Sequence, residues 1–226
     1  MQFKDIGALY FTFPQETPEE MLNYYTLNDT IPVIKFNRFF KDANDTHQDI
    51  WIKKDIDEKI NLLKNDMLKG TYGNKAIIKE LKELFQESNM EGKKILVIGS
   101  ETPWIEALCL HAGAAKVTTL EYGRIKSQHP QVVTLTPKEF RNKYMDGSLG
   151  TFDGVVSFSS IEHSGLGRYG DALNPWGDIL ATARAWCVTN DNGFMVLGLP
   201  TGDDKVGYFH LMIIKLYFYS KLFDFS

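Results

Sequence analysis

Residues 94–123, KILVIGSETPWIEALCLHAGAAKVTTLEYG, decide the fold of this chain. They open with an apolar, mostly β-branched run at 95–98, which is closed by Gly99. A run of this kind is too short to span a membrane and suits a parallel strand that is buried on both faces. The residues that follow signal a helix start, because Thr102 is a preferred N-cap and Pro103 is favoured at the first helical position.

The second half of the same stretch completes a strand–helix–strand unit. The helix is expected to end at Gly113, and a second apolar strand follows at 117–120. Glu121 stands directly after that strand. A strand, a glycine turn, a helix and a strand that ends in an acid are the layout of a Rossmann-type nucleotide-binding unit. Its glycine pattern is incomplete, since only Gly99 stands where such units usually have two or three glycines.

Further strands are expected downstream at 132–135, 153–158 and 194–199. The helix after the first of these begins with TPKE at 136–139, a capping box with proline in the first turn. Another helix opens at Asn174-Pro175, and a turn is expected at 190–193 before the last strand. Strands that alternate with helices predict an α/β, Rossmann-like three-layer sandwich with a mostly parallel sheet of order 3-2-1-4-5.

The rest of the chain divides by composition and periodicity. We interpret residues 1–50 as an irregular N-terminal arm with one short helix near 18–25, and residues 51–90 as a helical extension that packs on the core. The Rossmann-like core is expected at 91–206. Residues 207–226 are expected to form an apolar tail, interpreted as a helix or as an out-of-place, truncated or mispredicted segment, so the C-terminal edge of the sheet is expected to be incomplete.

Composition narrows the functional classes. The 226 residues are 43% hydrophobic, which is enough for a sizeable core, and the net charge of −4 argues against a general nucleic-acid binder. No transmembrane span is predicted, and the start of the chain lacks the features of a signal peptide, which favours the cytoplasm. Cys109 and Cys187 are expected to be buried free thiols in helices, with a disulfide between them as the alternative.

The strand ends point to a binding edge. In such sheets ligands bind outside the carboxyl ends of the strands, where the strand order reverses. Gly99 and Ser100 follow the first strand, where glycine permits close approach and helix-start amides can hold an anionic group. Glu121 and Tyr122 follow the second strand, where an acid can accept hydrogen bonds from both ribose hydroxyls of an adenosine cofactor. A solvated loop carboxylate is the alternative for Glu121.

The segment after the fourth strand, SFSSIEHSGLGRYGD at 157–171, is dense in polar chemistry. Glu162 and His163 are candidates for acceptor positioning or proton transfer. Arg168 could anchor a carboxylate or phosphate, and Asp171 is placed with it in a substrate site. The alternative is a glycine-rich loop whose polar groups satisfy its own backbone. A metal site made from Glu162, His163 and Asp171 is not supported by a familiar ligand spacing.

The segments VIGSETPWIEA, VTTLEYG and FDGVVSFSSIEHSGLGRYGDALNPWGD resemble a family catalogued as domain of unknown function 268, known mainly from nematode sequences. The resemblance covers about residues 24–206 and brings no assigned activity. The core of the family is similar to the class I S-adenosylmethionine-dependent methyltransferase fold. That likeness implies that Gly99 marks the methionine-side loop and that Glu121 is the ribose acid. The loop from Ser157 to Glu162 would border the methyl donor and acceptor.

Two functional hypotheses follow. In the first, the protein binds S-adenosylmethionine and transfers its methyl group to an acceptor that the sequence does not identify. Such a reaction depends chiefly on alignment, so no catalytic base need be visible. In the second, the protein is a non-catalytic Rossmann-like scaffold whose loop after the fourth strand binds a partner or small ligand. The sparse glycine loop favours the scaffold, whereas Glu121 and the polar loop favour the methyltransferase. The sequence has no G-x-S-x-G elbow, P-loop or cysteine pair for zinc.

Overall fold

The computed structural model describes residues 18–35, 49–70, 73–166, 171–200, 205–208, 212–214 and 223–224. The chain divides into two compact units. The first, called the sheet unit, comprises Thr46–Phe158, Cys187–Leu197 and Lys221–Ser226. The second, called the accessory unit, comprises Met1–Asp45, Ser159–Trp186 and Gly198–Ser220. Each unit has its own elements and its own candidate residues.

The sheet unit is built on six strands in the order β11-β8-β7-β3-β4-β6. These are β3 (Lys94–Ile98), β4 (Lys116–Leu120), β6 (Val132–Leu135), β7 (Phe152–Phe158), β8 (Thr189–Gly198) and β11 (Phe223–Asp224). β3 pairs in parallel with β4 and with β7, and β4 pairs in parallel with β6. The predicted order 3-2-1-4-5 is therefore confirmed. β11 adds an antiparallel neighbour to β8, beyond the five strands that were predicted.

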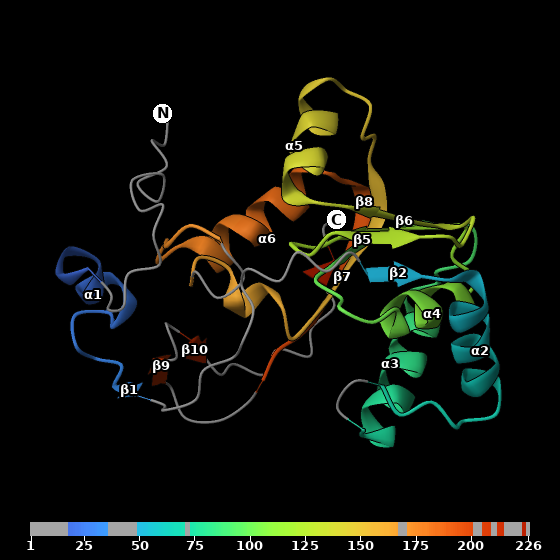
Figure 1. Cartoon of the computed structure of the whole chain (residues 1–226), viewed down its shortest axis with the longest axis horizontal. Coiled ribbons are helices and arrows are strands. Elements are labelled where there is room, and N and C mark those ends of the chain that lie inside the picture. Colours follow the sequence, from blue (N-terminus) through green and yellow to red (C-terminus); the bar gives the residue numbers. More distant parts are fainter. Residues whose placement is uncertain are drawn as a thin grey trace. The chain divides into compact units, whose positions relative to one another are not determined.

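Three helices supply the core of the sheet unit. α2 (Lys53–Lys64), α3 (Lys75–Glu87) and α4 (Trp104–His111) lie together on one side of the strands (Figure 1). Their apolar faces share one core with β3 and β4, which includes the fully buried side chains of Ile56, Leu63, Phe85, Ile95, Leu108 and Val117. Each such side chain contributes about 1.5–3 kcal/mol when it leaves water. This packing holds β3 and α4, the two elements that the loop after β3 connects, in one core.

α4 begins one residue later than the sequence predicts. Pro103 occupies the N-cap position and no side chain caps the helix, so the prediction of Thr102 as the N-cap is wrong. The reason is a tight turn, in which the Thr102 carbonyl accepts hydrogen bonds from the Trp104 N–H at 2.8 Å and from the Ser100 hydroxyl at 2.9 Å. Gly113 follows the helix with a φ of 95°, which is the left-handed conformation expected of a terminating glycine.

α5 (Pro137–Met145) begins as the sequence predicts. The Glu139 N–H donates to the Thr136 hydroxyl oxygen at 3.4 Å, and the Glu139 carboxylate accepts from the Thr136 N–H at 2.8 Å. These reciprocal bonds confirm the capping box. None of the side chains of α5 is buried, so the cap rather than core packing defines where this helix starts.

The predicted turn at 190–193 is wrong, because β8 runs through it. Asn192 keeps a turn-like φ of 61° inside the strand. Gly193 fits there because a Cβ would lie only 2.3 Å from Cγ2 of Thr189. The turn-forming residues thus produce a local irregularity of a long strand instead of ending it.

A two-stranded parallel ladder joins β2 (Asp49–Trp51) to β5 (Ile125–Ser127). β2 ends directly before α2, where the predicted helical extension begins, and β5 follows the short basic stretch that begins at Arg124. Trp51 is buried in the core, and its carbonyl accepts a hydrogen bond from the Gln128 N–H at 2.9 Å. Burial of this indole ring and pairing between the two strands hold both short segments extended, which their local sequences do not predict.

The accessory unit contains helices and a small sheet. Its elements are α1 (Glu19–Tyr25), the 3₁₀ turn η2 (Ile161–His163), α6 (Gly177–Cys187), β1 (Val33–Lys35), β9 (Lys205–Tyr208) and β10 (Met212–Ile214). α1 was predicted. β9 pairs in parallel with β1 and antiparallel with β10, and the sheet order is β1-β9-β10. Within the predicted apolar tail, residues 207–208, 212–214 and 223–224 are extended, so the helical interpretation is wrong for them, and the rest of the tail lies outside the described residues.

The two cysteines differ in their surroundings. Cys109 is buried in α4, as predicted, whereas Cys187 is exposed at the end of α6, so its predicted burial is wrong. Both are free thiols, and no disulfide joins them. Among the described residues, no helix has the length and apolar character needed to cross a bilayer.

Candidate functional site

The turn after β3 starts at Gly99. Its φ of 74° lies in the left-handed region that glycine adopts without strain. The Gly99 N–H donates to the Leu120 carbonyl at 2.9 Å, so the turn leaves the sheet level with the end of β4. Ser100 follows and is buried. The chain therefore turns sharply at the carboxyl ends of two neighbouring strands.

Glu121, directly after β4, holds this turn in place. Its Oε2 accepts a hydrogen bond from the Ser100 N–H at 2.7 Å, and its Oε1 accepts from the N–H groups of Tyr122 at 2.7 Å and Gly123 at 3.4 Å. Burial raises the pKa of the Glu121 carboxyl, the three backbone hydrogen bonds lower it, and the charge of Glu101 raises it. A carboxylate has about four acceptor positions, so Glu121 keeps capacity to accept from a ligand.

Glu106 in α4 is a buried acid that the sequence reasoning missed. Its side chain is inaccessible to solvent, its Oε2 lies 3.0 Å from the Ser100 hydroxyl, and its Oε1 accepts from the Thr119 hydroxyl at 2.7 Å. Burial raises the pKa of Glu106 to about 7, hydrogen bonds from Thr119 and Ser100 lower it, and the charge of Glu121 raises it. The available signal was a lone acid inside the apolar run at 104–110.

Ser100 connects the two acids. Its backbone N–H donates to Glu121, while its hydroxyl lies within hydrogen-bonding distance of both Glu106 and the Thr102 carbonyl. A hydroxyl has a single hydrogen to donate. Ionised Glu106 therefore competes with the Thr102 carbonyl for that hydrogen, whereas protonated Glu106 can donate its own proton to the serine oxygen and leave the Thr102 bond intact.

Ser157 and Tyr122 complete the predicted residues of the sheet unit. Ser157 lies in β7 opposite Ile98 of β3, is fully buried, and its hydroxyl donates to the Ile98 carbonyl at 3.2 Å. The side chain of Tyr122 is exposed beside Glu121. Ile98 is also the register partner of Leu120, so the ends of β3, β4 and β7 are level. The sheet unit thus brings Gly99, Ser100, Glu121 and Ser157 to one edge.

The other predicted residues lie in the accessory unit. Glu162 is only 7% exposed, and its Oε1 lies 3.8 Å from Nε2 of His163, which is partly buried. Asp171 Oδ2 accepts a hydrogen bond from the Gly165 N–H at 2.7 Å. Arg168 lies outside the described residues. Within the described part of the chain, no group of three or more histidine, cysteine, aspartate or glutamate side chains is arranged to hold a metal ion.

Solved structures resemble part of this chain. A proposed S-adenosylmethionine-dependent methyltransferase from Streptococcus mutans aligns with a TM-score of 0.39 and 13% identity over 52% of this chain and 33% of its own. A cyclopropane-fatty-acyl-phospholipid synthase-like protein from Lactobacillus casei aligns with a TM-score of 0.38 and 13% identity, over 66% of this chain and 61% of its own. A proposed hemolysin from Lactococcus lactis aligns with a TM-score of 0.35 and 22% identity, over 54% of this chain and 53% of its own. This chain covers less than two thirds of the length of each.

Sequence comparison gives a more definite result. No curated protein matches the chain. A family model described as "Caenorhabditis protein of unknown function, DUF268" matches residues 92–217, which are more than half of the chain and include the whole edge formed by Gly99, Glu121 and Ser157. The chain therefore belongs to this family.

Proposed function

We propose that the sheet unit binds S-adenosylmethionine and that the protein transfers its methyl group to an acceptor. The observation that carries this proposal is the Glu121 carboxylate, fixed at the end of β4 against the glycine turn that follows β3. In a sheet of order 3-2-1-4-5, ligands bind at the carboxyl ends of the strands near the point where the order reverses. That point lies between β3 and β7, where Ile98 faces Ser157.

The groups at this edge fit an adenosine ribose. Three backbone N–H groups use three of the about four acceptor positions of Glu121, so one remains for a ribose hydroxyl. The second hydroxyl would replace the longest of these bonds, from Gly123 at 3.4 Å. Gly99 has no side chain to block the approach of a ligand to the turn. When bound, S-adenosylmethionine supplies an activated methyl group, so the task of the chain is to hold donor and acceptor in line. Glu121 would orient the ribose, and Ser100 would keep Glu121 in position.

A non-catalytic scaffold is the second candidate, and one contact favours it. The Ser100 N–H, which in a ligand-binding turn would face the anionic end of a cofactor, already donates to Glu121 at 2.7 Å. A turn whose amides are satisfied internally is stable without a ligand. In this alternative, Glu121 serves to close the turn.

Isothermal titration calorimetry of the whole protein with S-adenosylmethionine separates the two candidates. We expect binding by the wild type, and a loss of about tenfold or more in Glu121→Ala, because hydrogen bonds to a charged group contribute about 1.5–3 kcal/mol each. Glu101→Ala is the matched control, since Glu101 is an exposed acid of the same loop, and it should bind like the wild type. A wild type that is folded by circular dichroism and does not bind would support the scaffold.

A further inference from the structure

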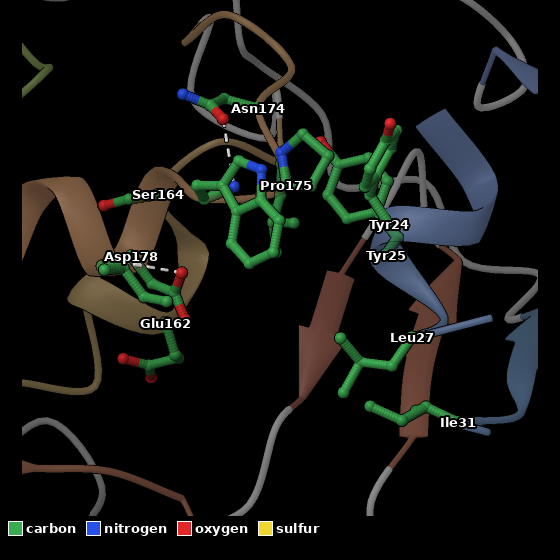
Figure 2. Close-up of a pocket in the computed structure, with 12 residues that line it drawn as sticks. Tyr24, Tyr25, Leu27, Ile31, Glu162, Ser164, Asn174, Pro175 and Asp178 are labelled. Atoms are coloured by element: carbon green, nitrogen blue, oxygen red, sulfur yellow. Dashed lines mark hydrogen bonds between the residues drawn. The ribbon is translucent and has the colours of Figure 1, made fainter. Parts of the chain in front are cut away.

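The accessory unit contains a pocket whose described lining belongs entirely to that unit (Figure 2). Its empty space, open mouth included, is about 520 Å³. α1 and the turn after it supply one wall, and the segment around η2 and the start of α6 supply the other. Figure 2 shows Tyr24 and Tyr25 on the first side and Ser164, Glu162 and Asp178 on the second. The pocket therefore joins segments that are far apart in the sequence.

Two half-exposed aromatic rings line this pocket. Tyr24 is 57% exposed and Trp176 is 48% exposed, and their ring centroids lie 6.4 Å apart with planes inclined at 61°. Because about half of each residue stays exposed, a ligand can reach the two rings. Tyr25 and Leu166 also line the pocket and are buried, and the Tyr25 hydroxyl donates to the Gly165 carbonyl at 2.6 Å. This bond ties α1 to the segment after η2.

The charged residues among the described lining are both acids. They are Glu162, whose Oε1 lies 3.8 Å from Nε2 of His163, and Asp178, whose Oδ1 accepts the Ile179 N–H at 2.8 Å. The charge of Asp178 acts on Tyr25 at the base of the pocket. Burial raises the pKa of Tyr25, and the negative charges of Asp171 and Asp178 raise it further. The pocket therefore combines open aromatic faces with negative charge.

We propose that this pocket binds a small organic cation, an alkylated ammonium group. An ammonium over the Tyr24 and Trp176 rings is attracted by their electron-rich faces, and its alkyl groups pack on the same rings. The Asp178 carboxylate complements the positive charge and would repel an anion. A bare metal ion would need several oxygen ligands, and no such group occurs among the described residues. The inference does not depend on the binding of S-adenosylmethionine.

Choline and its uncharged isostere 3,3-dimethylbutan-1-ol test this directly, because they have the same shape and differ in charge. We expect calorimetric titration of the whole protein to show binding of choline, and at least about tenfold weaker binding of the alcohol. Equal affinity for the two ligands would overturn the proposal, because it would show an apolar groove without charge selectivity. A folded wild type that does not bind choline would also overturn it.

Substitutions place the binding in the pocket. Trp176→Leu removes one ring but keeps an apolar side chain, and it should weaken choline binding about tenfold or more. Trp186→Leu is the matched control, since Trp186 is 56% exposed in α6 but is not among the described lining, and it should bind choline normally. Retained binding in Trp176→Leu, or equal loss in both variants, would contradict the assignment.

A second pair of substitutions tests the charge and covers the case in which Trp176→Leu fails to fold. Asp178→Asn can keep the hydrogen bond to the Ile179 N–H and removes only the charge, so choline binding should weaken several-fold. Asp191→Asn, at an exposed position of β8, should leave it unchanged. Unchanged choline affinity in Asp178→Asn would contradict the proposal that the Asp178 charge attracts the cation.

Discussion

Ser100 shows how one residue can couple two acids. Its N–H holds Glu121 outside α4, and its hydroxyl contacts Glu106 inside the core. Sequence reasoning placed Ser100 at the edge because of its position after a strand. It could not predict Glu106, because a periodicity argument assigns every residue of an apolar helix to packing. What distinguishes Glu106 from a packing residue is its contact with the hydroxyls of Ser100 and Thr119, which reach α4 only in the folded chain.

Protonation of Glu106 should be visible in the pH dependence of stability. Its pKa is about 7 in the folded chain against an ordinary value of 4.5. The folded state therefore holds the proton more tightly than the unfolded state, and this stabilisation is present at low pH and is lost as the pH rises from about 4.5 to 7. The full difference is about 3 kcal/mol at most. Glu106→Gln should remove it, because glutamine does not ionise.

Urea unfolding of wild type and Glu106→Gln at about pH 5 and pH 8 measures this contribution. The wild type should lose more free energy of unfolding between the two pH values than the variant does. Both proteins contain Glu121, whose pKa is also raised, so the comparison removes its contribution except for its electrostatic coupling to Glu106. Equal pH dependence in the two proteins would show that Glu106 does not titrate with a shifted pKa.

Elements differ in how well their sequences determine them. The strands at 95–98, 117–120 and 132–135 were predicted because each is a short apolar run bounded by turn or capping residues. β5 and the start of β8 at 189–193 were not, because their pairing overrides local preference. The Lys-containing segment 125–127 pairs with β2, and Asn192 adopts a turn conformation inside β8. Such contacts between distant segments are not encoded in local periodicity.

The capping box of α5 allows a test at this scale. Thr136→Ala removes the hydroxyl that accepts the Glu139 N–H, and loss of such a cap costs about 1 kcal/mol. Because α5 buries no side chain, we expect faster amide hydrogen exchange throughout 137–145 and little change elsewhere. Thr102→Ala is the control, since no side chain caps α4, and exchange in α4 should stay near the wild-type rate. If Thr102→Ala accelerated exchange in α4 more than Thr136→Ala accelerates it in α5, the assignment of the caps would be contradicted.

The whole molecule separates the candidate residues into two units. Gly99, Ser100, Glu121 and Ser157 belong to the sheet unit, whereas Glu162, His163 and Asp171 belong to the accessory unit. The sequence suggested the strand order of the first, because strands and helices alternate along the chain. It did not suggest the second, since β1 pairs with β9 from the other end of the chain. Binding of S-adenosylmethionine and of an organic cation can therefore be measured as separate properties.

The most direct test of the central claim asks whether Glu121 contacts the ribose of an adenosine cofactor. S-adenosylhomocysteine and an analogue that lacks both ribose hydroxyls are titrated into wild type and Glu121→Ala. If the carboxylate accepts the hydroxyls, the wild type should prefer the natural ligand by about tenfold or more, and Glu121→Ala should bind both ligands equally. A Glu121→Ala variant that prefers the natural ligand as strongly as the wild type does would contradict the account.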